Sequence, residues 1–215
     1  MEKVKCLIIV FVAWLVTLPV AFAQKKYTQG VLTIKTSMDG TPIAAKEYFD
    51  ADSTVFAFNT GPAAIKIMND AAYKGALAIL VDIPASSVKK VAIASPAEVQ
   101  ETIAGFPKLK FFATTGHKII SGFHCRKLIA MDAKSGLKYN VWITNDIILP
   151  RYVFPPYYFG IGGTLIEYSN IDHNGHTTLV TVTGVSGATP PAGTFAIPPA
   201  YQKIKMSDLN SVMAK

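Results

Sequence analysis

Hydrophobic and polar residues alternate over a long stretch in the middle of the chain, from Gly116 to Asp146. Successive side chains of a strand point to opposite faces, so this alternation predicts two strands. A polar loop ending in glycine, residues 133–136, separates them and predicts a β-hairpin. If the apolar faces of the two strands coincide, the hairpin has a defined register. That register pairs Met131 with Leu137, Ile129 with Tyr139, and Cys125 with Ile143.

Short runs of strand-forming residues recur along the rest of the chain, separated by turn residues. One segment, residues 63–74, is ambiguous. Pro62 just before it suits the start of a helix, whereas the alternation of Ile65 and Ile67 with polar Lys66 suits a strand. The clearer strands are predicted over residues 30–37, 45–49, 54–59, 76–82, 88–94, 109–115, 164–170 and 176–185.

One helix has clear start and stop signals. Ser95 is predicted as its N-cap, Pro96 occupies the first helical position, and Glu98 completes a capping box. Val99 and Ile103 form an apolar stripe, and Gly105 is expected to end the helix. A second short helix is predicted near the C-terminus, with a cap at residues 207–208.

This series of elements indicates a mainly β fold of the α+β type. We expect a single domain, built as a half-open antiparallel β-barrel or a strongly curved sheet with one or two helices packed on it. Neither an internal repeat nor a low-complexity tract divides the chain. Whether the interior is hollow or filled is left open by the sequence.

The first 23 residues resemble a secretory signal peptide. Lys3 and Lys5 precede an apolar core, and the small residues Ala21 and Ala23 mark a cleavage site before Gln24. The apolar run is short for a membrane span. Cys6 lacks the small residues that precede a lipidated cysteine, so we expect an exported, unlipidated chain of residues 24–215.

Charge and cysteine content narrow the possible functions. The chain has 21 Lys and Arg against 14 Asp and Glu, a net charge of +7, and its positive residues are dispersed. Without a basic cluster or base-stacking aromatics, we expect no nucleic-acid binding, whereas an anionic membrane surface is a possible partner. Removal of the signal peptide would leave Cys125 as the single thiol, which excludes an internal disulfide. The oligomeric state is not determined by the sequence.

The sequence contains no recognisable catalytic, metal or cofactor motif, so we expect neither an enzyme nor a cofactor. His173 and His176 have metal-like spacing but flank the tight turn Asn174-Gly175, so they are interpreted as solvated turn residues. His124 and Cys125 are neighbours on a strand and therefore point to opposite faces. Cys125 is interpreted as a small core residue, with a redox or pairing role as the alternative.

The central hairpin also carries a family resemblance. The segments Thr115-Gly116, Ile120 to Lys127, Val141 to Thr144 and Asp146 resemble a pattern in envelope proteins of Gram-negative bacteria whose domain has unknown function. That family looks related to the LolA/LolB-type lipoprotein carriers. The C-terminal segment 195–201 resembles their closing signature. The resemblance implies one LolA-like domain in the periplasm, a hydrophobic hollow, and a strand at residues 63–69.

An aromatic segment, residues 150–163, is the strongest candidate for a ligand site. Proline and glycine prevent it from being regular, and it is expected either to plug one end of the sheet or to form a portal over a cavity. Two functions remain: a periplasmic non-enzymatic binding protein for a lipid, acyl chain or lipoprotein, or a structural interaction module with a filled core. The predicted ligand-binding residues are Tyr152, Phe154, Tyr157, Tyr158 and Phe159.

Overall fold

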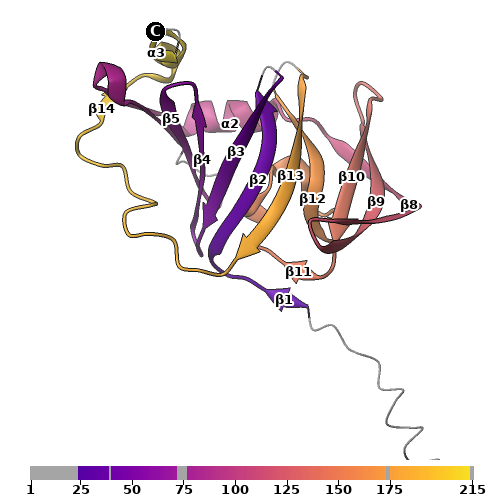
Figure 1. Cartoon of the computed structure of the whole chain (residues 1–215). Coiled ribbons are helices and arrows are strands. Elements are labelled where there is room, and N and C mark those ends of the chain that lie inside the picture. The colour runs from indigo at the N-terminus through magenta and orange to yellow at the C-terminus, as the bar shows by residue number, and fades with distance from the viewer. Residues whose placement is uncertain (1–23, 39, 72–76, 173–174, 214–215) are drawn as a thin grey trace, which may run out of the picture.

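The computed structural model describes residues 24–38, 40–71, 77–172 and 175–213 (Figure 1). The predicted signal peptide, residues 1–23, lies outside the described residues, as does His173. In the described ranges, no helix has the length and apolar character needed to cross a membrane.

Twelve strands form one open, curved sheet. Their order across the sheet is β14-β7-β6-β5-β4-β3-β2-β13-β12-β10-β9-β8. The strands are β2 (Gly30–Met38), β3 (Thr41–Phe49), β4 (Ser53–Thr60), β5 (Ala63–Asp70), β6 (Leu77–Ile83), β7 (Val88–Ile93), β8 (Leu109–Ile120), β9 (Phe123–Asp132), β10 (Lys138–Thr144), β12 (Thr164–Ile171), β13 (Thr177–Ser186) and β14 (Gln202–Ile204).

The chain builds this sheet in two antiparallel runs. The first run, β2 to β7, is a meander, and helix α2 (Pro96–Ala104) then leads to the far edge at β8. The second run returns through β9, β10 and β12 to β13, which pairs with β2 and joins the two runs. Because β8 and β14 are the two edges, the sheet is not closed, and of the two predicted forms the half-open barrel is not confirmed.

Smaller elements complete the fold. Strand β14 joins β7 in parallel, and a separate pair, β1 (Lys25–Lys26) with β11 (Ile147–Ile148), is also parallel. Short 3₁₀ turns are η1 (Pro84–Ser86), η2 (Arg151–Val153), η3 (Pro156–Tyr158) and η4 (Met206–Asp208), and η4 leads into helix α3 (Leu209–Met213). The mainly β prediction with two short helices is confirmed for the described residues.

Most element predictions agree with the structure. Helix α2 has the expected capping box, in which the Glu98 amide donates to Ser95 Oγ and the Ser95 amide donates to the Glu98 carboxylate. The ambiguous segment is a strand, β5, as far as Asp70. Two strands are longer than predicted: β3 begins at Thr41, and β8 continues to Ile120.

The register predicted for the central hairpin is wrong by one residue. Met131 lies opposite Lys138, Ala130 opposite Tyr139, and Cys125 opposite Thr144. The turn explains the shift, because the Asp132 amide donates to the Leu137 carbonyl at 2.9 Å and the Asp132 carboxylate accepts the Ser135 hydroxyl at 2.7 Å.

Asp132 and Leu137 form the last pair before the turn, and residues 133–136 make up the loop. Compared with the prediction, the partner of each residue moves by one position, so the side chains of one strand lie beside the opposite face of the other. Leu128 and Ala130, which the predicted alternation places with the polar side chains, are therefore buried opposite Val141 and Tyr139.

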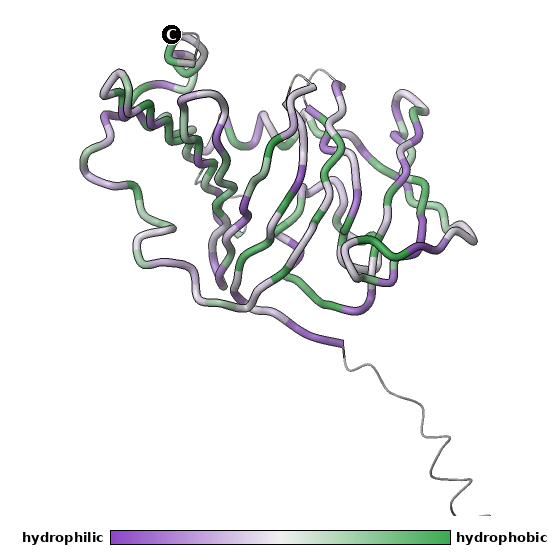
Figure 2. The backbone as a smooth tube through the Cα atoms, in the orientation of Figure 1, coloured by the Kyte–Doolittle hydropathy of each residue, from purple (hydrophilic) through white to green (hydrophobic). Residues whose placement is uncertain are grey.

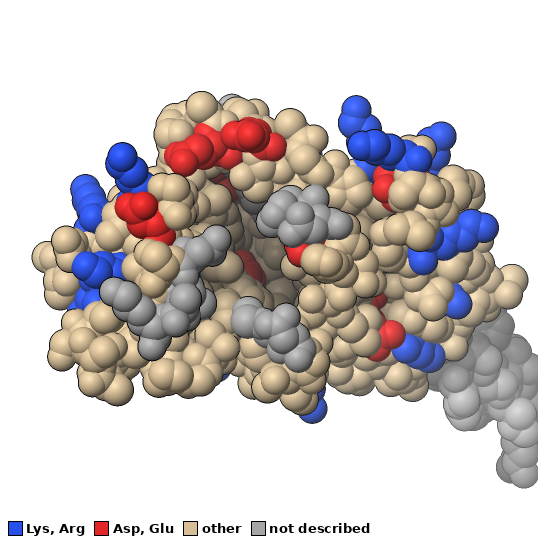
Figure 3. Space-filling model, turned by 90° about the horizontal axis from the view of Figure 1, so that it is seen from above, with Lys and Arg blue, Asp and Glu red and all other residues tan. Residues whose placement is uncertain are grey.

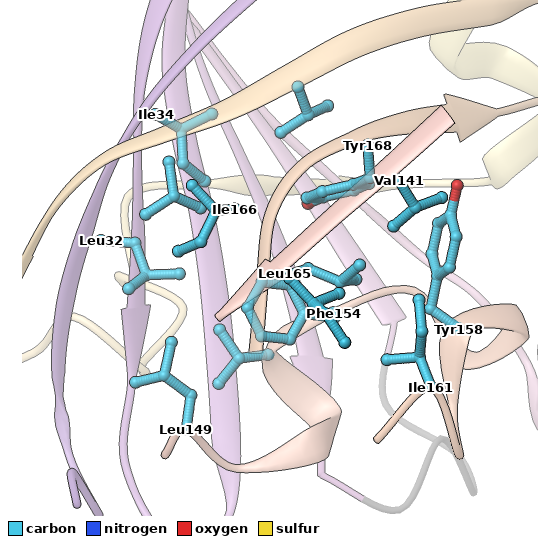
Figure 4. Packing of buried hydrophobic residues seen from close by; sticks show 14 of the residues in the cluster. Leu32, Ile34, Val141, Leu149, Phe154, Tyr158, Ile161, Leu165, Ile166 and Tyr168 are labelled. Atoms are coloured by element: carbon cyan, nitrogen blue, oxygen red, sulfur yellow. The ribbon is translucent and has the colours of Figure 1, made fainter. Parts of the chain in front are cut away.

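The main core lies on the concave side of the second run and of the adjoining strands β2 and β3. Figure 2 shows hydrophobic and hydrophilic residues alternating along the strands, as expected when one face of a sheet is covered. Leu165 and Ile166 of β12 and Leu32 of β2 are almost completely buried. Figure 4 shows Phe154 and Tyr158 of the irregular segment pointing into this core.

Candidate ligand cavity

A cavity of about 830 Å³ opens on the concave side of the sheet. Its walls come from strands β2 to β5 and the start of β6, from helix α2, from η2 and η3, and from the adjoining parts of β12 and β13. Figure 3 shows the hollow from above, with acidic side chains inside it and on its rim. Ser37 and Gly40 near the β2–β3 turn and Asp172 and His176 between β12 and β13 line the cavity at this end of the strands, which we call its mouth.

The sheet supplies an apolar wall because its register brings inward residues of neighbouring strands side by side. Phe56 of β4 lies between Glu47 of β3 and Ile67 of β5, and all three side chains line the cavity. The Phe56 and Phe58 rings are 5.5 Å apart and also border the cavity. Both rings are only half-buried, so this wall offers hydrophobic surface to a ligand.

Helix α2 forms the opposite wall. Val99, Thr102 and Ile103 of the helix and Phe106 just after it line the cavity, and Val99 is the buried member of this group. The Phe106 ring meets the Tyr157 ring in an edge-to-face contact, with centroids 5.3 Å apart. This contact connects the helix to the aromatic segment and thereby joins two walls of the cavity.

The aromatic segment is firmly held by hydrogen bonds to β12. The Tyr157 hydroxyl donates to Asn170 Oδ1 at 2.8 Å and accepts the Ile171 amide at 2.9 Å. The Tyr158 hydroxyl donates to the Ser169 carbonyl at 2.8 Å. Burial raises the pKa of Tyr157 to about 12, so its hydroxyl stays protonated and can keep donating.

The structure separates the five predicted ligand-binding residues into two groups. Tyr152, Phe154 and Tyr157 line the cavity. Tyr158 is 2% exposed and packs against Tyr168 and Phe111, with ring centroids 5.4 and 6.2 Å away. Phe159 is half-buried, with the Arg151 guanidinium 5.4 Å from its ring centroid. Neither Tyr158 nor Phe159 borders the cavity, and ligand contact by any of the five stays a prediction.

Sequence reasoning missed the most unusual residue of the cavity, Glu47. Its side chain lines the cavity, yet the residue is only 7% exposed. Loss of water around the carboxyl raises the pKa of Glu47 to about 8, although the Thr54 hydroxyl donates a hydrogen bond that opposes this rise. A signal was present, because Glu47 stands on the apolar face of an alternating strand with Ile43, Ala45 and Phe49.

Two carboxyl groups of the described residues border the cavity. Glu47 lies deep inside it and Asp172 at its mouth, where the Asp172 carboxylate contacts His176 Nδ1 at 3.0 Å. Within the described part of the chain, no Lys or Arg lines the cavity.

The other candidate groups lie elsewhere. Cys125 is 2% exposed, and burial raises the pKa of its thiol to about 11, which disfavours the reactive thiolate. The His124 side chain is on the surface beside Asp146, at 3.2 Å. In the described ranges, no three His, Cys, Asp or Glu side chains are grouped so that they could hold a metal ion.

No protein-family model and no curated protein sequence matches this chain. Among solved structures, PNGF-II is similar at a TM-score of 0.50 and 12% identity over 87% of this chain. This chain spans about a third of the length of PNGF-II (33%), and the likeness concerns the fold alone.

Two further solved structures are similar at lower scores. MucB in complex with MucA(peri) has a TM-score of 0.35 and 11% identity, over 83% of this chain and 57% of that chain. A LolA superfamily protein from Nitrosomonas europaea has a TM-score of 0.28 and 11% identity, over 79% and 89%. The resemblance to an envelope family of unknown function stays a prediction.

Proposed function

We propose that this protein is a non-enzymatic binding protein of the bacterial periplasm that holds a hydrophobic ligand in its cavity. The ligand would be a lipid, an acyl chain or the lipid part of a lipoprotein. The observation that carries the proposal is the cavity itself, about 830 Å³ in volume and walled by Phe56, Ile67 and Ile103. Ligand pockets in proteins commonly have about 300–1,000 Å³ and mostly apolar walls.

The proposed compartment rests on the sequence. The segment with Lys3, Lys5 and the apolar core resembles an export signal, and export would place the chain next to the envelope membranes. The excess of positive charge would favour contact with an anionic membrane surface, from which a lipid could be taken.

The first experiment is mass spectrometry of an organic extract of the natively exported protein. A bound lipid in stoichiometric amount is the expected result. Protein that carries no lipid, binds no hydrophobic fluorescent probe and instead captures an envelope protein would favour the alternative, an interaction module.

A cavity-filling variant then tests where the ligand binds. Ile103→Trp places a larger side chain on the helical wall and should reduce probe affinity at least about tenfold, because the apolar ligand and the indole compete for the same volume. Ile93→Trp is the matched control, since Ile93 is exposed on β7 and does not border the cavity. Equal affinities of the two variants would show that the probe binds elsewhere.

A further inference from the structure

Acidic and basic side chains are distributed differently between the cavity and the rest of the protein. The chain has an excess of Lys and Arg and a net charge of +7. In the described structure these cations stay outside the cavity, whereas Glu47 and Asp172 border it. Figure 3 shows the blue side chains lying away from the hollow. A ligand that entered this cavity would therefore meet carboxyl groups and apolar side chains.

Glu47 lies deep in the cavity. Ile43 also lines the cavity on the same strand, four residues nearer the mouth, which corresponds to about 13 Å at the usual rise of ~3.3 Å per residue. The cross-strand neighbours of Glu47 are Leu32 and Phe56, both apolar. The carboxyl group thus has apolar neighbours on both adjacent strands, and the Thr54 hydroxyl donates to it.

We propose that the cavity selects a cationic amphiphile, a ligand with an apolar body and an ammonium group that forms an ion pair with Glu47. This inference rests on the proposed function and specifies its ligand class. The ammonium group would donate hydrogen bonds to the carboxylate, and the apolar body would contact Phe56, Ile103 and Phe154, which line the same cavity.

The residue type argues for a cation rather than a neutral or anionic head group. An ionised carboxyl group is costly to bury unless an opposite charge accompanies it, whereas a glutamine could bind a neutral hydroxyl or carbonyl group without titrating. A carboxylate or phosphate on the ligand would meet no Lys or Arg in the described lining and would be repelled by an ionised Glu47.

Proton exchange gives this inference a distinct signature. Because burial raises the pKa of Glu47 to about 8, the carboxyl group of the free protein is mostly protonated at pH 6.5. Binding an alkylammonium ion would ionise it, and its proton would pass to the solvent. Affinity should therefore rise with pH, by up to about tenfold per unit, and level off above pH 8.

Other ionisable groups also face the cavity and must be distinguished from Glu47. They are Tyr152, Tyr157 and Tyr168 on the side of the aromatic segment and β12, and Asp172 and His176 at the mouth. The pKa values of Tyr152 and Tyr157 are raised by burial, so these hydroxyls do not ionise between pH 6 and 8. A pH dependence that came from His176 would persist after Glu47 is replaced.

The experiment compares three probes with the same ten-carbon chain, decylammonium, decanol and decanoate, by calorimetry below the micelle concentrations of the two ions and the solubility limit of decanol. Decylammonium should bind most tightly to the wild-type protein, with release of about one proton at pH 6.5. Glu47→Gln should weaken decylammonium binding about 10- to 100-fold, abolish the proton release and the pH dependence, and leave decanol affinity within about twofold. Glu167→Gln, the same change outside the cavity, should alter none of these values.

The outcomes separate this inference from the proposed function. If none of the three probes binds, the proposed hydrophobic site itself fails. If decanol or decanoate binds as tightly as decylammonium, or if Glu47→Gln retains the proton release, the cavity binds hydrophobic ligands but the ammonium inference is overturned. Thermal unfolding of Glu47→Gln without ligand confirms that the variant is folded.

Discussion

The two runs of the sheet share the same alternation of residues but differ in what covers their concave faces. Over the second run, the aromatic segment fills the space, and Tyr158 is 2% exposed against Leu165 at 1%. Over the first run, Phe56 and Ile67 remain half-buried and border the cavity. A strand pattern therefore identifies the inward face, whereas the covering segment decides whether that face becomes core or cavity wall.

The covering segments explain this difference. The aromatic segment brings several large side chains to the second run and is anchored to β12 by two tyrosine hydroxyls. Helix α2 has nine residues, and Val99 is its only buried residue. A helix this short lies across the sheet without filling the space below it, so the first run keeps a hollow.

The largest expected effect lies in the filled half. Tyr158→Ala should lower the free energy of unfolding by about 3–5 kcal/mol, because it leaves a cavity in a close-packed region. Chemical denaturation measures the change. Tyr158→Phe is the control, since it removes only the hydrogen bond to the Ser169 carbonyl and should cost about 1 kcal/mol. A loss below about 1 kcal/mol for Tyr158→Ala would mean that this half is not packed as described.

The next effect concerns the hollow half and depends on pH. The pKa of Glu47 is about 8 in the folded protein and near 4.5 in the unfolded chain, so the folded state holds the proton more tightly. Its contribution to stability is complete below pH 4.5 and is lost as the pH rises towards 8.

Between pH 5.5 and 7.5 this loss should amount to about 2.5 kcal/mol, because the slope of about 1.4 kcal/mol per unit decreases as the pH approaches the folded pKa. Glu47→Gln does not titrate, so its stability relative to the wild type should improve by that amount over this range. Denaturation curves of both proteins at the two pH values measure it, and parallel pH profiles would show that Glu47 ionises freely in the folded state.

A smaller effect is expected when an aromatic side chain of the cavity wall is truncated. Phe56→Ala should cost only about 1–2 kcal/mol of stability, less than a fully buried aromatic residue, because the ring already borders open space. The same variant should weaken hydrophobic probe binding. A stability loss as large as that of Tyr158→Ala would remove the distinction between the two halves.

The smallest effect is expected at Cys125 in the second run. Cys125→Ala should cost about 1 kcal/mol, as a small buried truncation does, and leave probe binding unchanged. Because burial raises the pKa of the thiol to about 11, the native protein should react slowly with a thiol reagent and rapidly in denaturant. Rapid labelling of native protein would support the redox alternative instead.

Features that depend on neighbours in sequence could be predicted from the sequence alone. The start of helix α2 follows from Ser95, Pro96 and Glu98, whose capping contacts span three residues. The strand series and the hairpins follow from period-two alternation and turn residues. The mainly β class and the candidate aromatic segment needed no further information.

Tertiary structure decided the features that depend on distant contacts. The hairpin register is an exception, because it followed from the local turn at Asp132, which the prediction from matching apolar faces did not consider. The sheet is open because its two edge strands, β14 and β8, do not pair with each other. Glu47 became a cavity residue only when β3, α2 and the aromatic segment came together, since burial, and with it the raised pKa, is a property of all the walls at once.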